Sequence, residues 1–368
     1  MDAPLSPAYI RRAMRYIGNK TKLLGFIRDV LRTRGIRPGT AVDPFTGTAS
    51  VARALKRWGF RVLASDIMEY AFVFGRAYVE VQPPLDLSGL TDELGTHSPT
   101  LRATIAYLNR IPPAPGFIYT HFAPDGEEGR RHGRMYFTPE NAARIDAIRT
   151  TIQRWRKEAK IDDDAFHVLL AALIEAADRV ANTTGVYASF VKTWQPNAVR
   201  PLRLRTPRLL PGNGCRAARR DALELVSELE PFDLLYLDPP YNTRQYPGYY
   251  HIPELLAIGW FDGPVHLRGK TGLLPDEDKR SDWARRGRCE EALEALVARA
   301  TCKHIVMSYN TEGIIPEATI RRVLTSYGRR STYEKYTLRY KRYRSDSDGE
   351  NRRYRGDVVE ECLYCVDR

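Results

Sequence analysis

Cysteine is scarce in this chain of 368 residues, and long apolar stretches are missing altogether. The five cysteines are an odd number in a chain too large to need disulfide bridges, so we expect reduced thiols and a cytoplasmic protein. Cys362 and Cys365 have the spacing of half a zinc site, but no second Cys or His pair completes it, so we expect no metal. No run approaches the roughly 18 apolar residues of a membrane span, which predicts no membrane partner.

Acidic residues are outnumbered by basic ones. The chain has 57 Lys and Arg against 45 Asp and Glu, a formal net charge of +12, and its 21 tyrosines and 12 phenylalanines are interleaved with the basic residues. Arg and Lys bind phosphates without regard to base sequence, which favours a nucleic acid as the partner. Charge alone fits an ordinary basic protein equally well, so the choice of partner depends on the motifs.

Short apolar runs alternate with helical patterns at both ends of the chain. This alternation is typical of βαβ units and a mostly parallel sheet, which predicts an α/β fold. The expected strands cover residues 39–45, 60–66, 232–238 and 303–310, and the expected helices cover residues 50–59 and 289–300. Two Tyr-rich runs, 331–344 and 354–366, flank a stretch of turn residues and predict a C-terminal strand hairpin.

Residues 76–204 differ from the rest of the chain. Pro- and Gly-rich stretches are followed by two long helical patterns over residues 138–160 and 163–185, the first of which opens on a Thr-Pro pair. We therefore expect one α/β domain, formed by residues 1–75 and 205–368, with a mainly helical region inserted into it.

Ligands in open α/β sheets lie at the carboxyl ends of the strands, so the residues that follow each expected strand are candidates for a site. The first strand runs into Asp43-Pro44-Phe45-Thr46-Gly47-Thr48, where a glycine lets backbone N–H groups approach a ligand at the start of the next helix. The second ends at Asp66-Ile67, where a carboxylate can accept hydrogen bonds from two ribose hydroxyls. Together these motifs predict a ligand that contains a nucleoside.

Two further acidic residues follow later strands. Asp221, in the pair Asp221-Ala222, can accept from an exocyclic amino group of that nucleoside, although an Asp on a turn caps a helix more often. Asp238-Pro239-Pro240-Tyr241 ends a strand, because proline has no N–H and a fixed φ. The Asp238 carboxylate and the Pro239 carbonyl can then accept both hydrogens of a planar amino group, and Tyr241 can stack on the heterocycle that carries it.

Three motifs in this order resemble those of a known family. They are Tyr16-Ile17-Gly18-Asn19-Lys20, Asp43-Pro44-Phe45-Thr46-Gly47-Thr48 and Asp238-Pro239-Pro240-Tyr241. In these motifs, and in the long insertion before the last of them, the chain is similar to the S-adenosylmethionine-dependent, adenine-specific DNA methylases of the Dam type and of restriction–modification systems. The family usually has a second glycine where this chain has Ala49.

The resemblance implies a Rossmann-like methyltransferase sheet with a reversed C-terminal strand, S-adenosylmethionine as the cofactor and double-stranded DNA as the substrate. A methyl group would pass to the N6 amino group of a flipped-out adenine, with Asp238 as acceptor, Tyr241 as stacking platform and no metal. Tyr16, Gly18, Asn19 and Lys20 would join the strand-end motifs around the cofactor. Region 76–204 would recognise the target, and a cognate restriction endonuclease is a further partner that the resemblance admits.

The candidates for DNA binding rest on charge. Seven arginines lie between Arg200 and Arg220, and charge runs of this kind also occur on ordinary solvated surfaces. The residues that we expect to touch DNA are Lys192, Arg203, Arg205, Arg208, Arg244 and Tyr246.

Other functions on the same scaffold stay open. Transfer to cytosine N4 shares the geometry, although Ser more often stands in place of Asp238. RNA guanine-N2 methyltransferases can have a similar tetrapeptide but usually lack the N-terminal motif and the insertion. A catalytically silent DNA-binding protein would not need Asp238, Tyr241 and Gly47, and measurable cofactor binding would separate the two. No Pro-Cys dipeptide is present to supply the nucleophile of a cytosine-5 enzyme.

Overall fold

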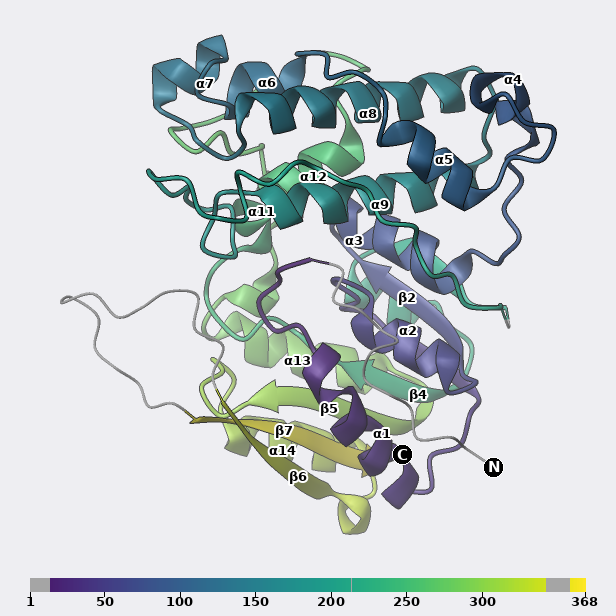
Figure 1. The fold of residues 1–368 in the computed structure, drawn as a ribbon. Coiled ribbons are helices and arrows are strands. Elements are labelled where there is room, and N and C mark those ends of the chain that lie inside the picture. Colours follow the sequence, from purple (N-terminus) through teal and green to yellow (C-terminus); the bar gives the residue numbers. More distant parts are fainter. Residues whose placement is uncertain (1–13, 213, 342–357) are drawn as a thin grey trace.

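The computed structural model describes residues 14–212, 214–341 and 358–368. Within them the chain forms a seven-stranded sheet with the strand order β3-β2-β1-β4-β5-β7-β6 (Figure 1). The strands are β1 Thr40–Asp43, β2 Arg61–Asp66, β3 Arg216–Arg219, β4 Phe232–Leu237, β5 Cys302–Asn310, β6 Glu334–Lys341 and β7 Val358–Asp367. The expected α/β fold is thereby confirmed.

The first five strands are parallel and β7 is antiparallel to both of its neighbours. Strand β4 is apolar except at Asp233, and β5 is buried from Ile305 to Tyr309, as parallel strands are when helices cover both faces of the sheet. The reversed strand and the C-terminal hairpin are confirmed, while the expected turn at 345–352 lies outside the described residues.

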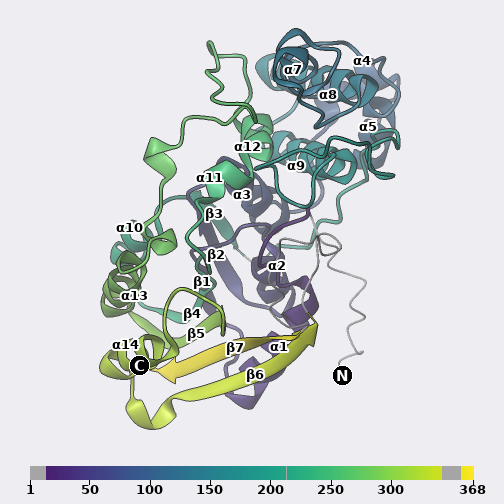
Figure 2. The ribbon, with the colours of Figure 1, turned by 90° about the vertical axis from the view of Figure 1, so that its left-hand side faces the viewer.

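Helices cover both faces of the sheet. Along β4, Leu234 and Tyr236 pack in one hydrophobic cluster with α1, whereas Leu235 and Leu237 pack in a second cluster with α13 and α14. Figure 2 shows α10, α13 and α14 on one side of the sheet and α1 and α2 on the other. These helices are α1 Leu24–Thr33, α2 Ser50–Arg57, α3 Glu69–Gly75, α10 Ala222–Ser227, α13 Arg288–Arg299 and α14 Glu317–Tyr327.

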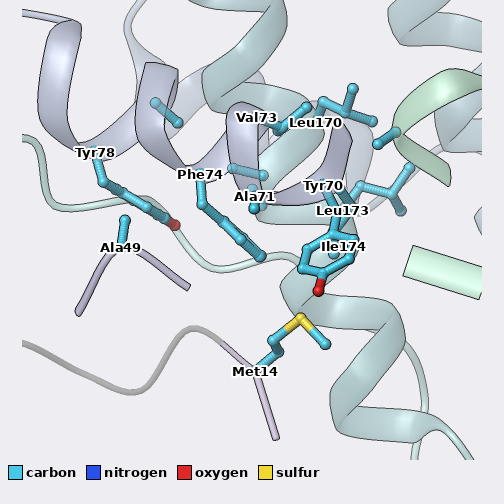
Figure 3. Packing of buried hydrophobic residues seen from close by; sticks show 14 of the residues in the cluster. Met14, Ala49, Tyr70, Ala71, Val73, Phe74, Tyr78, Leu170, Leu173 and Ile174 are labelled. Carbon is cyan, nitrogen blue, oxygen red and sulfur yellow. The ribbon is translucent and has the colours of Figure 1, made fainter. Parts of the chain in front are cut away.

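The region 76–204 is mainly helical. It contains the helices α4 Thr91–Leu94, α5 Leu101–Leu108, α6 Phe117–Phe122, α7 Glu127–His132, α8 Pro139–Lys157 and α9 Asp163–Val180, with the shorter turns η3 Arg76–Glu80 and η4 Ser88–Leu90. Leu170, Leu173 and Ile174 of α9 pack beside Val73 of α3, in one cluster that continues into the sheet (Figure 3). The helical region therefore shares its core with the sheet.

Two helix ends inside this region show how far the local sequence sets where a helix begins and ends. The Thr138 side chain accepts a hydrogen bond from the Asn141 N–H and Pro139 occupies the first turn, so α8 begins where the Thr-Pro pair predicted. Helix α9 ends at Val180, and the expected extension to residue 185 is wrong. Ala181 is extended, and the Asn182 side chain donates to two carbonyls outside the helix, which takes the chain off the helix axis.

After β4 the chain returns towards the helical region. It forms α11 Tyr246–Tyr249 and α12 His251–Ile258, and the remaining short turns are η2 Thr21–Leu23, η5 Glu277–Lys279, η6 Asp282–Ala284 and η7 Arg330–Thr332. Helix α12 packs against both α3 and α9. The segment that follows the Asp-Pro-Pro-Tyr motif thus joins the sheet to the helical region.

The topology creates one crevice at the carboxyl ends of the strands. From β1 the chain proceeds to β2 and β3 on one side, and it later continues from β4 to β5 on the other. Ligands bind where the direction of winding changes, here between β1 and β4. Asp43 and Asp238, at or just after the ends of these strands, therefore lie at this switch point.

The structure also bears on the expectations about thiols, metal binding and membrane spans. All five cysteines lie within the described residues, and each is buried and outside any disulfide. Cys362 and Cys365 of β7 belong to the clusters on opposite faces of the sheet. Among the described residues no group of three or more His, Cys, Asp or Glu side chains is placed to hold a metal ion. Over the same ranges, no helix combines the length and the apolar character needed to cross a bilayer.

Candidate active site

A pocket opens at the carboxyl ends of β1, β2 and β4. It encloses about 940 Å³ of empty space, its open mouth included. Every residue that the sequence assigned to catalysis or to cofactor binding lines this pocket. Motifs that are more than 200 residues apart in the sequence thus face one cavity.

The turn after β1 forms one wall of the pocket. Gly47 has a φ of +52°, and a Cβ atom at this position would lie 2.9 Å from Cε1 of Tyr16. Its N–H donates to Oδ2 of Asp66 over 2.9 Å. Glycine is required at this position because the turn is left-handed and closely covered by the Tyr16 ring.

Ala49 occupies the position of the family's second glycine. It adopts a φ of +57° at the start of α2, the left-handed conformation that glycine accepts more readily. Its side chain is fully buried in the same cluster as Phe74 and Tyr78 and does not line the pocket (Figure 3). The methyl group is therefore accommodated by the core and leaves the cavity open.

The N-terminal motif forms an adjoining wall. Tyr16 stacks on Tyr250 with ring centroids 4.7 Å apart. Asn19 donates to the hydroxyls of Thr48 and Ser50 over 3.0 and 3.1 Å, which ties the motif to the turn after β1. Gly18 has a φ of +79°, and a Cβ there would lie 3.0 Å from the Tyr241 ring. The motif thus packs against both the turn after β1 and the ring that follows β4.

Asp66 and Asp221 lie on the same side of the pocket in different environments. Asp66 accepts from the N–H groups of Gly47 and Met68, and burial raises the pKa of this carboxyl to about 6. Each of its oxygens keeps a lone pair for a ligand hydroxyl. Asp221 is exposed, and its Oδ1 accepts from the N–H groups of Leu223 and Glu224. Asp221 is thus a helix cap that also borders the pocket, and no described residue donates a hydrogen bond to its Oδ2.

Asp238 lies at the centre of a buried polar cluster. Lys20 Nζ is 3.3 Å from Asp238 Oδ1 and also donates to the Tyr241 hydroxyl, which in turn donates to Asp238. Burial raises the pKa of Asp238 to about 7, the Lys20 ammonium opposes this rise, and Glu361 adds to it. The carboxyl therefore changes its charge near neutral pH.

Asp43 adds a further acidic group to this cluster. Its carboxyl is buried, and burial together with the charge of Asp238 raises its pKa well above the usual range. Its backbone carbonyl accepts from the Thr46 hydroxyl over 2.9 Å, which closes the turn after β1. The pocket therefore carries an excess of acidic over basic groups among the described residues that line it.

Several contributors were not expected from the sequence. Glu361 of β7 is 3.2 Å from Lys20 Nζ and carries no local motif that marks it. Gln245 and Ser281 exchange two hydrogen bonds of 3.0 and 2.8 Å, which holds the segment of η5 and η6 over the pocket. From this segment Trp283 packs edge-on against Phe45, with ring centroids 4.9 Å apart. These contacts join segments that are distant in the sequence, so a local sequence pattern does not predict them.

The candidate DNA-binding residues do not form one patch. Lys192 and Arg244 are exposed in separate loops, whereas Tyr246 is partly buried in the wall of the pocket, 5.6 Å from the Tyr16 ring. Arg203, Arg205 and Arg208 are exposed along one extended segment. A groove beside this segment is lined by Asn109, Ala176, Arg179, Val180, Asn197, Arg200, Pro201, Arg203, Leu204 and Arg205.

Comparison with known proteins decides the family. Residues 16–315 match the D12 class of N6 adenine-specific DNA methyltransferases. The chain belongs to this family. This DNA adenine N6-methyltransferase is 32% identical to the type II methyltransferase M.NlaIII of Neisseria lactamica over 362 residues, which cover 96% of the chain and 99% of that protein.

Two further relatives are longer than this methyltransferase. It is 35% identical to the type II methyltransferase M.FokI of Planomicrobium okeanokoites, over 90% of the chain and 50% of that protein. It is 29% identical to the modification methylase StsI of Streptococcus sanguinis, over 96% of the chain and 52% of that protein. The chain thus spans about half the length of these two relatives. The expected family, and transfer to adenine N6 in DNA, are confirmed over the alternatives on cytosine N4 and RNA guanine.

Proposed function

We propose that this methyltransferase binds S-adenosylmethionine in the pocket between β1, β2 and β4 and receives a flipped-out adenine of double-stranded DNA at Asp238. The observation that carries the proposal is the convergence of all three motifs on one cavity at the switch point of the sheet. The type II relatives support a role in a restriction–modification system, with a cognate endonuclease as partner.

The pocket suits the proposed cofactor. Asp66, with free acceptor capacity, would hold the ribose hydroxyls, and the backbone at Gly47 leaves room beside it. Phe45, Trp283 and Ile67 offer apolar walls for a heterocycle. The acidic groups Asp43 and Asp238 favour a positive centre near the end of β4. When bound there, S-adenosylmethionine supplies a methyl group already activated on a sulfonium centre.

Asp238 and Pro239 would position the target amino group. Oδ2 of Asp238 carries no hydrogen bond from the described part of the chain, so it and the Pro239 carbonyl can accept the two amino hydrogens. The nitrogen lone pair then points away from both acceptors. The nitrogen becomes positive as its bond to the methyl group forms, and the ionised Asp238 stabilises that charge.

Tyr241 would receive the extruded base. Its ring is packed edge-on against Tyr309, with ring centroids 5.1 Å apart, and close to Gly18. The Tyr241 hydroxyl bound to Asp238 holds the tetrapeptide in a fixed conformation. Extruding a base from a duplex costs a few kcal/mol, and stacking on an aromatic ring returns about 1–3 kcal/mol per base. Tyr241 and Asp238 would thus share the capture of the adenine.

The arginine-lined groove is our candidate for the DNA backbone. Leu202 and Leu204 are buried, so Arg203 and Arg205 point outward on the same side of the extended segment. The Asn109 side chain accepts from the Leu204 N–H over 2.8 Å and donates to its carbonyl over 3.0 Å, which fixes the segment. Guanidinium groups on a fixed backbone can bind phosphates with little loss of conformational entropy. We therefore assign target recognition to region 76–204.

The experiment that tests this function replaces Asp238 by alanine. We expect D238A to bind S-adenosylmethionine and duplex DNA nearly as the wild type does, but to transfer the methyl group at least about 100-fold more slowly. Mass spectrometry of DNA treated with the wild type should show N6-methyladenine, with little product on RNA of the same sequence. Asp262, exposed and outside the pocket, gives a matched control as D262A.

Two results would contradict the proposal. N4-methylcytosine as the only product would reject adenine as the target. Activity of D238A near that of D262A would reject Asp238 as the acceptor.

A further inference from the structure

We propose that Glu361 of β7 is a positioning residue of the methyl-transfer site, which holds the Lys20 ammonium against Asp238 and keeps the second oxygen of Asp238 available to the adenine amino group. The inference rests on the proposed role of Asp238. Lys20 and Glu361 are buried, and Lys20 Nζ is 3.2 Å from Glu361 Oε2 and 3.3 Å from Asp238 Oδ1.

The ammonium of Lys20 has three acceptors beside it. It has three N–H donors, and its neighbours are Glu361, Asp238 and the hydroxyl of Tyr241. Asp238 and Tyr241 are hydrogen-bonded to each other beside the end of β4, whereas Glu361 contacts the ammonium from β7. Glu361 thus restrains the position of Lys20, and through it the orientation of Asp238 and Tyr241.

A structural ion pair alone does not explain Glu361. The Lys20 charge is already offset by Asp238, and a second buried carboxylate adds desolvation cost and repulsion. At Asp238, burial raises the pKa to about 7, the Lys20 ammonium opposes this rise, and the charge of Glu361 adds to it. An arrangement that served only stability would do better without Glu361, so we assign to Glu361 the positioning of Lys20.

The groups that face Asp238 come from several elements. Asp43 lies on β1, Lys20 on the N-terminal segment and Glu361 on β7, and their charges act on the cluster together with that of Asp238. Of the other described groups near Asp238, Tyr241 is hydrogen-bonded to it and Asp66 acts on Asp43. Burial raises the pKa values of Tyr236, Tyr246 and Tyr309, so these three stay neutral near pH 7. A change in the titration of Asp238 on removal of Glu361 is thus an effect of its negative charge.

The sign of the effect follows from this arrangement. Methyl transfer requires ionised Asp238, so kcat/KM should rise as the pH increases through about 7. Replacing Glu361 by glutamine removes the negative charge that raises the pKa of Asp238. We expect the acid limb of the E361Q profile to move to lower pH by about one unit. We also expect a lower limiting rate, because the amide holds Lys20 less firmly.

The matched control is the preceding residue of the same strand. Glu360 carries the same charge, but its side chain bonds to the exposed Arg339 rather than to Lys20. We expect E360Q to keep the wild-type acid limb and rate. E361D, which retains the charge, should keep the acid limb while losing rate.

A second readout does not depend on turnover. In cofactor-free protein with ¹³C-labelled aspartate carboxyls, the resonance that is missing in D238N reports the titration of Asp238. It should titrate at lower pH in E361Q than in E360Q. The double variant K20Q/E361Q removes both partners and should fold even where E361Q does not. If Glu361 acts through Lys20, the rates of K20Q and K20Q/E361Q should be nearly equal.

The outcomes separate this inference from the proposed function. The role of Glu361 is overturned if Asp238 titrates at the same pH in E361Q as in the wild type, or if E360Q shifts that titration by the same amount. In either case an inactive D238A would still support the role of Asp238. A further loss of rate from K20Q to K20Q/E361Q shows that Glu361 does not act through Lys20. Full activity of D238A instead rejects the proposed function itself.

Discussion

Replacing Gly47 by alanine should strain the turn after β1 and lower the free energy of unfolding. The new Cβ would lie 2.9 Å from Cε1 and 3.1 Å from the hydroxyl of Tyr16. Tyr16 cannot move away freely, because it is stacked on Tyr250 and bonded to the hydroxyl of Tyr70. In addition, alanine at a φ of +52° costs about 1–2 kcal/mol relative to glycine.

The two effects can be combined into one expected magnitude. Overpacking of a fixed neighbour costs about 1–3 kcal/mol, and the lower entropy of the unfolded alanine chain returns about 0.4–1 kcal/mol. We therefore expect G47A to lower the free energy of unfolding by about 2–4 kcal/mol. Urea denaturation followed by tryptophan fluorescence measures this change through the midpoint.

A matched variant gives the opposite expectation. Gly25, in α1, has no atom within 4 Å of its added Cβ and no left-handed φ, so G25A should stabilise the protein by about 0.5–1 kcal/mol. Calorimetry should show weaker binding of S-adenosylmethionine to G47A and unchanged binding to G25A. A G47A protein as stable as the wild type would refute the argument that Tyr16 covers this turn rigidly.

The remaining predictions concern the cofactor and the DNA. D66A should bind S-adenosylmethionine about tenfold or more weakly, because hydrogen bonds to the ligand are lost. The affinity of the wild type should fall as the pH drops below about 6, where Asp66 becomes protonated. Unchanged affinity of D66A in calorimetry would remove Asp66 from the site. R203A/R205A should flatten the dependence of DNA affinity on salt by about two units, one per phosphate contact. An equal change in R321A/R322A, on the exposed side of α14, would show that only net charge matters.

The strand-end motifs could be read from the sequence because they are local. A buried strand that ends on Asp238 and two prolines must leave the sheet, since proline cannot donate to the ladder. A glycine turn between a strand and a helix likewise predicts a ligand at the helix start. The family, the α/β class and the residues around the pocket were therefore accessible from short stretches of sequence and from their order.

The helix boundaries were accessible only in part. Thr138 and Pro139 set the start of α8 by local hydrogen bonding. The end of α9 at Val180 depends on the bonds of Asn182 to distant carbonyls, which a periodic pattern does not contain. Likewise, the contact of Tyr246 with DNA stays a prediction, while the place of its ring in the pocket wall beside Tyr16 comes from tertiary packing.

The local groups are written in the sequence: the residues that turn the chain at the strand ends and the side chains that carry acceptors. Which of these groups lie close enough to shift one another's pKa depends on the three-dimensional arrangement. Lys20, Asp238 and Glu361 are separated by more than 100 residues in each step along the chain, and they meet because the parallel order of β1 and β4 and the reversal of β7 bring them to one edge. Electrostatic energy depends on distance in space and on burial, so the ionisation of Asp238 is a property of the fold.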